Sequence, residues 1–137
     1  MVILALAATH VDVASEFLAT AQDALRDGRT RVFADTLFSA TELVAKADLL
    51  LLPLPGFTKK LTHRRIESKV HLLSVSGRVP EGFKDAFNEL GKLRRDTRYL
   101  DSPYSISDES AKRLLRTVQE RLDEIRQDTS LALSDPV

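Results

Sequence analysis

Cysteine and tryptophan are absent from this 137-residue chain, and glycine and proline occur only five times each. The lack of cysteine excludes disulfides, thiolate nucleophiles, cysteine-ligated zinc sites and iron–sulfur clusters. The longest apolar runs, residues 1–8 and 49–54, fall far short of the ~20 residues that cross a bilayer. We therefore predict a cytoplasmic protein without a membrane segment.

Apolar residues recur at helical spacing along nearly the whole chain, and no stretch alternates every two residues as a strand would. The pattern predicts one all-α domain over residues 1–137, an antiparallel up-and-down bundle of about five helices. Helices are expected over residues 12–27, 30–52 and 59–76, then from Pro80 and from Ser107. Residues 1–10 are expected to form an N-terminal arm, and residues 129–137 a loose tail.

The second expected helix has the clearest apolar pattern. Its seam steps by 4, 3, 4, 3 and 4 through Phe33, Leu37, Ala40, Val44, Ala47 and Leu51. A continuous buried stripe of this length places the helix at the centre of the bundle.

Local signals mark other helix ends and faces. Gly28 is expected to end the first helix, whose buried stripe would include Val13 and Phe17. Ser107 is expected to cap the last helix. The charged residues of that last helix are expected to face solvent, namely Lys112, Arg113, Arg116, Glu120 and Arg121.

Charge is distributed unevenly along a chain whose formal net charge is zero. Residues 59–98 hold eleven basic and five acidic residues, so this section carries +6 and the rest of the chain −6. The section closes with residues 94–99, Arg-Arg-Asp-Thr-Arg-Tyr. Such a distribution predicts a face for an anionic partner, a phosphate or RNA.

Several short motifs occur in a fixed order along residues 12–127. They are Ala-Gln-Asp-Ala-Leu-Arg-Asp-Gly at 21–28, Ala-Thr-Glu-Leu-Val-Ala-Lys-Ala-Asp-Leu at 40–49, His63, Leu-Arg-Arg-Asp-Thr-Arg-Tyr at 93–99 and Ser-Asp-Glu-Ser-Ala at 107–111. Together they resemble the HEPN domains (higher eukaryote and prokaryote nucleotide-binding), helical bundles that usually dimerise.

The resemblance also bears on activity. Many members of the family are metal-independent ribonucleases that use an arginine and a histidine separated by four to six residues, paired across a dimer. Here Arg94, Arg95 and Arg98 are followed by Tyr99 and by no histidine. A tyrosine whose pKa is near 10 is a poor general base at neutral pH.

The resemblance therefore implies a nucleotide- or RNA-binding or accessory domain of a toxin–antitoxin or defence-type system. It would work as a homodimer or with a partner protein, without a cofactor. One alternative is a metal-independent endoribonuclease toxin. It would use Arg65 and His71, which have the required spacing but lie in the third expected helix, or a variant of the motif with Arg95 and Tyr99. A second alternative is a ligand-free dimerisation scaffold.

The sequence also assigns roles to individual side chains. A buried Glu42 would need a cation, and Arg95 or Arg98 is the expected partner in an internal clamp. His63, Glu67 and His71 have metal-ligand spacing, but a surface ion pair and a half-buried histidine explain them as well, so no metal is predicted. The expected ligand-binding residues are His63, Arg64, Arg65, Arg94, Arg95, Arg98 and Tyr99.

Overall fold

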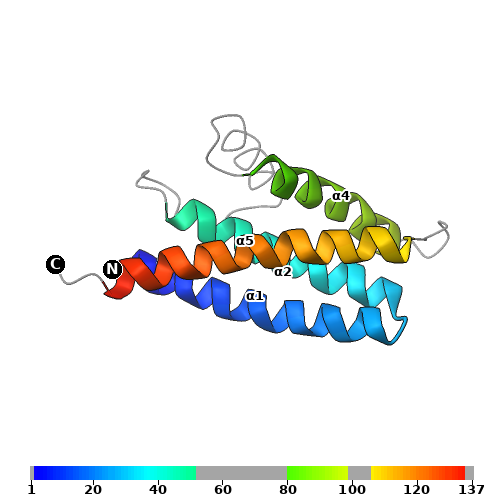
Figure 1. Ribbon diagram of the computed structural model, residues 1–137, viewed down its shortest axis with the longest axis horizontal. Helices are drawn as coiled ribbons and strands as arrows, with labels where there is room; N and C mark the ends of the chain where they lie inside the picture. The colour runs from blue at the N-terminus through cyan, green and yellow to red at the C-terminus, as the bar shows by residue number, and fades with distance from the viewer. Residues whose placement is uncertain (1, 52–79, 99–105, 135–137) are drawn as a thin grey trace.

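The computed structural model describes residues 2–51, 80–98 and 106–134, and this part of the chain contains helices and no strand. The helices are α1 (Val2–Arg26), α2 (Thr30–Leu50), α4 (Glu81–Arg98) and α5 (Asp108–Ser134) (Figure 1). The predicted all-α fold is confirmed for these residues. The helix expected over residues 59–76 lies outside them.

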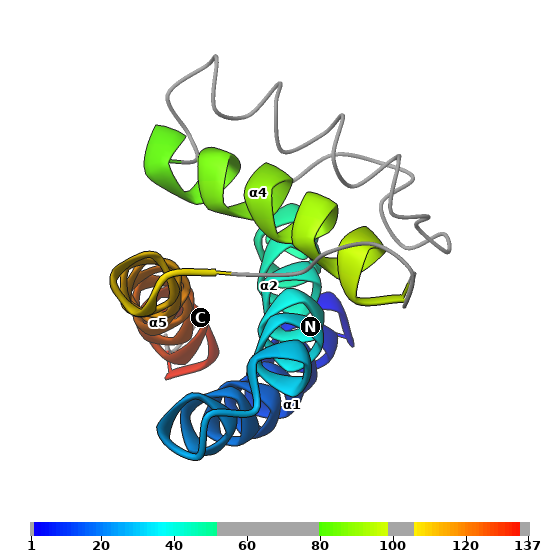
Figure 2. The ribbon, with the colours of Figure 1, turned by 90° about the vertical axis from the view of Figure 1, so that its right-hand side faces the viewer.

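Successive helices run in opposite directions, and α2 lies at the centre (Figures 1 and 2). Helix α2 contacts α1, α4 and α5, whereas α1 and α4 make no contact with each other within the described residues. Seen end-on, α4 crosses one side of the group formed by α1, α2 and α5 (Figure 2). The central place predicted for the second helix is confirmed.

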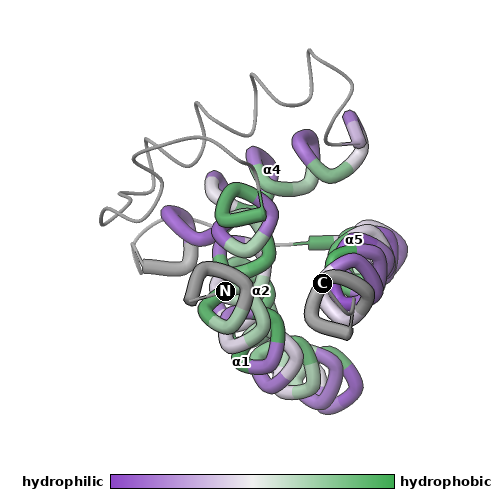
Figure 3. The backbone as a smooth tube through the Cα atoms, turned by 90° about the vertical axis from the view of Figure 1, so that its left-hand side faces the viewer, coloured by the Kyte–Doolittle hydropathy of each residue, from purple (hydrophilic) through white to green (hydrophobic). Residues whose placement is uncertain are grey.

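The core is built around the predicted seam of α2. Phe33, Leu37, Ala40, Val44 and Ala47 are fully buried. The apolar stripes predicted for the helices beginning near Pro80 and Ser107 are buried too, through Phe83, Phe87, Leu90, Ala111, Leu114, Val118, Leu122 and Ile125. On α5 the outward side is hydrophilic and the side facing the other helices is hydrophobic (Figure 3).

Helix α1 differs from the expectation in its start and in its buried face. It begins at Val2, so residues 2–10 extend the helix and do not form a separate arm. Its buried stripe runs through Ala7, Val11, Ala14, Leu18 and Ala21. The helix begins earlier than expected because alanine and leucine are strong helix formers and because Ala7 and Val11 continue this buried stripe.

Phe17 was expected in the buried stripe of α1, and this is wrong: its exposure is 37%. The alanine-rich stripe one position along the helix is buried in its place. Small side chains let two helix backbones approach closely, so the α1–α2 contact favours alanine over the larger phenylalanine. The apolar side of α1 that Phe17 shares is consequently left at the surface.

The turn between α1 and α2 is fixed by backbone hydrogen bonds around Gly28. The N–H of Gly28 donates to the carbonyl of Leu25 at 3.2 Å, and the N–H of Arg29 donates to that of Ala24 at 2.8 Å. Gly28 has a φ of 74°, the left-handed conformation that such helix ends require and that glycine adopts without strain. The predicted stop at Gly28 is confirmed.

The start of α5 is capped as the sequence predicts, but its end lies further along the chain. The backbone N–H of Ser110 donates to Ser107 Oγ at 3.1 Å, and Asp108 and Glu109 occupy the first turn, where carboxylates stabilise a helix. The helix then continues to Ser134, through residues 129–134 that were expected to be loose. Thr129 is buried and its hydroxyl donates to the carbonyl of Ile125 at 2.8 Å.

A buried ion pair joins α2 to α5. Arg121 Nη2 donates to Asp48 Oδ2 at 2.6 Å, and the two side chains are only 10% and 9% exposed. Arg121 Nη1 also donates to Glu124 Oε2 at 3.1 Å. The expected solvent-facing position of Arg121 is therefore wrong, because a carboxylate buried in α2 requires a cation and the apolar stem of arginine can be buried with it.

None of the described helices is long and apolar enough to cross a membrane.

Backbone conformation leads us to expect different effects on stability when Gly28 and Gly82 are each replaced by alanine. In Gly28→Ala the added Cβ meets no atom within 4 Å, so only the left-handed conformation opposes it, at about 1–2 kcal/mol of unfolding free energy. Gly82→Ala, in the first turn of α4, also meets no atom within 4 Å and has no positive φ. We expect it to be neutral or to stabilise by up to about 1 kcal/mol. Urea unfolding followed by circular dichroism measures both, and an unchanged midpoint for Gly28→Ala would contradict the account of the turn.

Candidate ligand-binding site

The described part of the predicted site lies on the second half of α4. Phe83, Phe87 and Leu90 bury one side of this helix. The rings of Phe87 and of Phe38 in α2 lie 6.2 Å apart between centroids, at an interplanar angle of 43°. Consecutive residues of a helix point about 100° apart, so the way α4 packs on α2 determines which of Arg94 and Arg95 faces α2.

Arg94 points towards α2. Its Nε lies 3.4 Å from Asp35 Oδ1, and its guanidinium carbon lies 4.8 Å from the centroid of the Phe38 ring. Asp35 and Phe38 are three residues apart and therefore neighbours on one face of α2. An anion at one edge and an aromatic face below hold the guanidinium, and the Arg94 side chain is 33% exposed.

Arg95 points to the surface. It is exposed and forms no hydrogen bond or ion pair with any described residue. Asn88 and Lys92 precede it at helical spacing and are exposed as well, so the three share one stripe of α4. Lys92 likewise has no ion pair within the described part of the chain. This stripe, which we call the α4 basic stripe, offers two unpaired cations and one amide to an anion.

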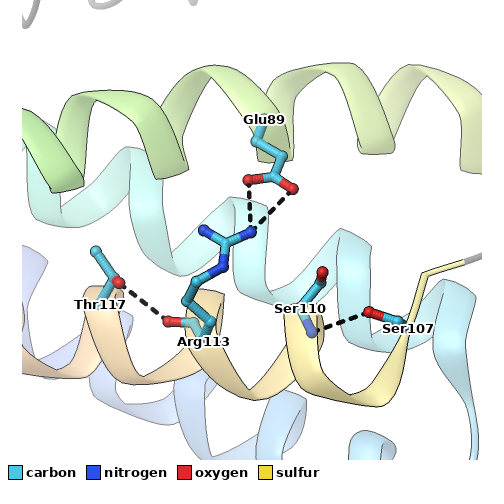
Figure 4. Close-up of polar contacts among 5 residues, drawn as sticks. All are labelled: Glu89, Ser107, Ser110, Arg113 and Thr117. Atoms are coloured by element: carbon cyan, nitrogen blue, oxygen red, sulfur yellow. Dashed lines mark hydrogen bonds and ion pairs between the residues drawn. The ribbon is translucent and has the colours of Figure 1, made fainter.

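Helix α4 is also tied to α5. Arg113 Nη2 lies 3.3 Å and 3.2 Å from the two carboxylate oxygens of Glu89 (Figure 4). The pair is half-exposed, at 54% and 40% of the side chains, so it contributes at most about 1 kcal/mol to stability. The pair matters mainly for the position of α4, because this helix is held by α2 through Arg94 and by α5 through Glu89.

Only part of the predicted Glu42 clamp lies within the described residues. Glu42 is half-buried and Arg95 is exposed, so Arg95 is not an internal partner. The side chain of Arg98 lies outside the described residues, and a clamp through Arg98 stays a prediction. Within the described part of the late arginine run, Arg94 pairs with an acidic residue of α2, and that residue is Asp35.

Most other predicted site residues fall outside the described part of the chain. They are His63, Arg64, Arg65, Glu67, His71 and Tyr99. Asp35 and Phe38 were not predicted from the sequence, although an acidic residue three positions before an aromatic one on the central helix is a usable signal for a docked arginine.

The described residues contain no group of three or more histidine, aspartate or glutamate side chains able to hold a metal ion. The one described histidine, His10, lies in α1, a helix without contact to α4 in the described structure. Its Nδ1 is 2.8 Å from the carbonyl oxygen of Leu6. His10 is therefore not a partner for Arg94 or Arg95 within one chain.

Comparison with known proteins identifies one family. A family model described as HEPN domain matches residues 7–127, which include all of α2 and α4 and most of α1 and α5. This match confirms the resemblance found in the sequence motifs. No curated protein and no solved structure matches the chain.

We expect substitutions of the two neighbouring residues Arg94 and Arg95 to have different effects on stability. Arg94→Gln loses the Asp35 contact and the Phe38 ring contact, which together are worth about 1 kcal/mol at this partly exposed position. A loss of this size lowers the Tm by roughly 3 °C for a domain of this length. Arg95→Gln removes the same charge from the next residue and should leave the Tm within about 1 °C. Equal shifts in differential scanning calorimetry would show that Arg94 is not the docked residue.

Proposed function

Because this chain belongs to the HEPN domain family, we propose that it is a nucleotide- or RNA-binding domain that holds phosphate groups without cleaving RNA. The observation that carries the proposal is the α4 basic stripe, in which Lys92 and Arg95 are exposed and unpaired with other described residues. Guanidinium and ammonium groups left without a carboxylate are available to phosphate oxygens.

The fixed position of α4 supports this role. A binding surface is more effective when its residues do not have to be ordered by the ligand. Arg94, held by Asp35 and Phe38, and Glu89, held by Arg113, anchor the helix on either side of Lys92. The stripe is thereby presented on a rigid element.

Binding without cleavage fits the side chains of the late arginine run. Cleavage of RNA without a metal needs a group that moves protons near neutral pH, and histidine is the usual one. No histidine follows residue 71 in the sequence. A role as an accessory in a toxin–antitoxin or defence-type system, as a homodimer or with a partner protein, belongs to the same proposal.

RNA binding by matched arginine variants tests the proposal. Fluorescence anisotropy with a labelled 20-nucleotide single strand, in EDTA, is expected to show binding that weakens as salt rises, because bound phosphates release counterions. Arg95→Gln should weaken binding several-fold and reduce the salt slope by about one. Arg116→Gln removes an exposed arginine from α5 and should change the affinity less than twofold.

Competition and product analysis distinguish the remaining outcomes. Displacement of the labelled strand by ATP at micromolar concentration would identify a nucleotide as the ligand, and displacement by RNA alone would identify RNA. Cleaved RNA in EDTA, lost in His71→Ala, would overturn the proposal in favour of a ribonuclease. Equal weakening by Arg95→Gln and Arg116→Gln, or no binding of either ligand, would also contradict it.

A further inference from the structure

The α4 basic stripe is one half of a longer exposed face of the same helix. Exposed positions step by 4, 3, 4 and 3 through Glu81, Asp85, Asn88, Lys92 and Arg95, so these five residues share one side of α4. We call them the outer face of α4. Charge changes sign along this face, from two carboxylates through one amide to two cations.

The helix dipole explains only part of this order. Carboxylates near the start of a helix and cations near its end are stabilising, but the effect is confined to the first and last turns. Glu81 lies in the first turn of α4. Asp85 is the fifth residue of this helix and Lys92 is the seventh from its end, so both lie outside the terminal turns. The dipole therefore leaves their opposite charges unexplained.

Asp85 and Asn88 are both accessible to a ligand. The Asp85 side chain is 67% exposed, and Lys84 Nζ, at 4.0 Å from its Oδ1, is too distant for a hydrogen bond. Asn88 is exposed and forms no hydrogen bond with any described residue. A carboxylate only accepts hydrogen bonds, and an amide both donates and accepts them. The two side chains together therefore suit hydroxyl groups.

Phosphates can be held over only part of the outer face. Lys92 and Arg95 are three residues apart, with Cβ atoms about 5–6 Å from each other, so they can hold neighbouring phosphates. Asp85 lies about 10 Å before Lys92 along the helix and repels a phosphate placed over it. Asp96 comes seven residues after Glu89 and so borders the face on the side of α5. The carboxylates thus confine phosphates to the C-terminal half of the face.

We propose that the outer face of α4 binds one ribonucleoside polyphosphate, which lies along the helix. Its phosphates contact Lys92 and Arg95, and its ribose hydroxyls donate to Asp85 and exchange hydrogen bonds with Asn88. The two pairs of side chains are about 10 Å apart along the helix axis, a separation that a ribose and its 5′-triphosphate can span. Dinucleotide-binding folds likewise use an acidic residue to hold a ribose hydroxyl.

This inference rests on the proposed function and selects a nucleotide over a long RNA strand. A strand lying along α4 would carry further phosphates over Asn88 and Asp85, whereas a nucleotide presents its uncharged ribose there. The one exposed aromatic side chain in the described part of the chain is Phe17, on a helix without contact to α4. No described aromatic ring is therefore placed to stack on the base, and the face recognises the ribose and the phosphates.

Titrations with three probes test the two halves of the face separately. Phosphorus NMR in EDTA gives dissociation constants for ATP, 2′-deoxy-ATP and inorganic triphosphate. The wild type is expected to bind ATP about threefold or more tightly than 2′-deoxy-ATP, because the missing hydroxyl leaves its acceptor unpaired. Asn88→Ala should weaken ATP binding and change triphosphate binding less than twofold.

The decisive variant is Asp85→Ala, for which the two ligands should respond in opposite directions. ATP binding should weaken about threefold or more, because the ribose loses an acceptor that is charged. Binding of inorganic triphosphate should become slightly tighter, because a repulsive charge is removed. This gain is small, since the carboxylate is about one Debye length from the bound phosphates.

Two further variants serve as references. Arg95→Gln should weaken all three probes several-fold, because each of them presents phosphates. Asp12→Ala removes a carboxylate from an exposed position of α1 and should change each dissociation constant less than twofold. Circular dichroism checks that every variant keeps the helix content of the wild type.

The inference and the proposed function fail in different ways. Tighter binding of both ATP and triphosphate by Asp85→Ala would show that Asp85 only repels anions, and would overturn the inference. Equal binding of ATP and 2′-deoxy-ATP by the wild type would overturn it too. In both cases weaker binding by Arg95→Gln would still support phosphate binding at the stripe. If Arg95→Gln leaves all three probes unchanged, or none binds the wild type, the inference fails together with nucleotide binding at this stripe.

Discussion

The buried ion pair between Asp48 and Arg121 fixes the relation between α2 and α5. A carboxylate that is 91% shielded from solvent is tolerated only with a cation at hydrogen-bonding distance, and Arg121 supplies it at 2.6 Å. A shift of α5 by one turn, or its rotation by one residue, would separate the two groups. Apolar contacts alone are less selective, because many registers bury similar area.

The position of α4 follows from this register. Arg113 lies two turns before Arg121 on α5 and reaches Glu89 of α4, while Asp35 and Phe38 of α2 hold Arg94 of the same helix. Helix α4 thus spans two helices whose relation the buried pair has already set. The consequence is a division of the arginine run: Arg94 is used inside the fold, and Arg95 is left for an anion. This division is what the proposed binding of phosphate groups depends on.

Much of the fold was predictable because it depends on local physics. The seam of α2 was identified because only one stripe of that helix is continuously apolar, and Gly28 and Ser107 mark helix ends by their own conformational and hydrogen-bonding preferences. The buried face of α1 was not predictable in the same way. Its sequence offers two overlapping apolar stripes, and the one rich in alanine is preferred only once a neighbouring helix approaches closely. The same choice leaves Phe17 at the surface.

The site residues show a second limit of prediction from the sequence. Arg94 and Arg95 are adjacent in sequence, and which of them turns inward depends on the angle at which α4 docks, a property of the whole bundle. Asp48 sits in the apolar end of α2 and signals that a cation must be near. Nothing local selects Arg121 among the basic residues of the last helix. Most of the +6 excess of the basic section comes from residues 59–79, outside the described structure.

The most direct test of this account is the coupling energy between Asp48 and Arg121, from a double-mutant cycle of Asp48→Ala, Arg121→Ala and both together in urea unfolding. Asp48→Ala leaves the buried Arg121 with the more exposed Glu124, and Arg121→Ala removes an ion-pair partner of a buried carboxylate, so each single variant is expected to lose about 2–3 kcal/mol. The double variant should lose clearly less than the total of the two, with a coupling of about 2 kcal/mol. Losses that add within about 0.5 kcal/mol would show that the two residues act independently and that the register of α5 on α2 is set elsewhere.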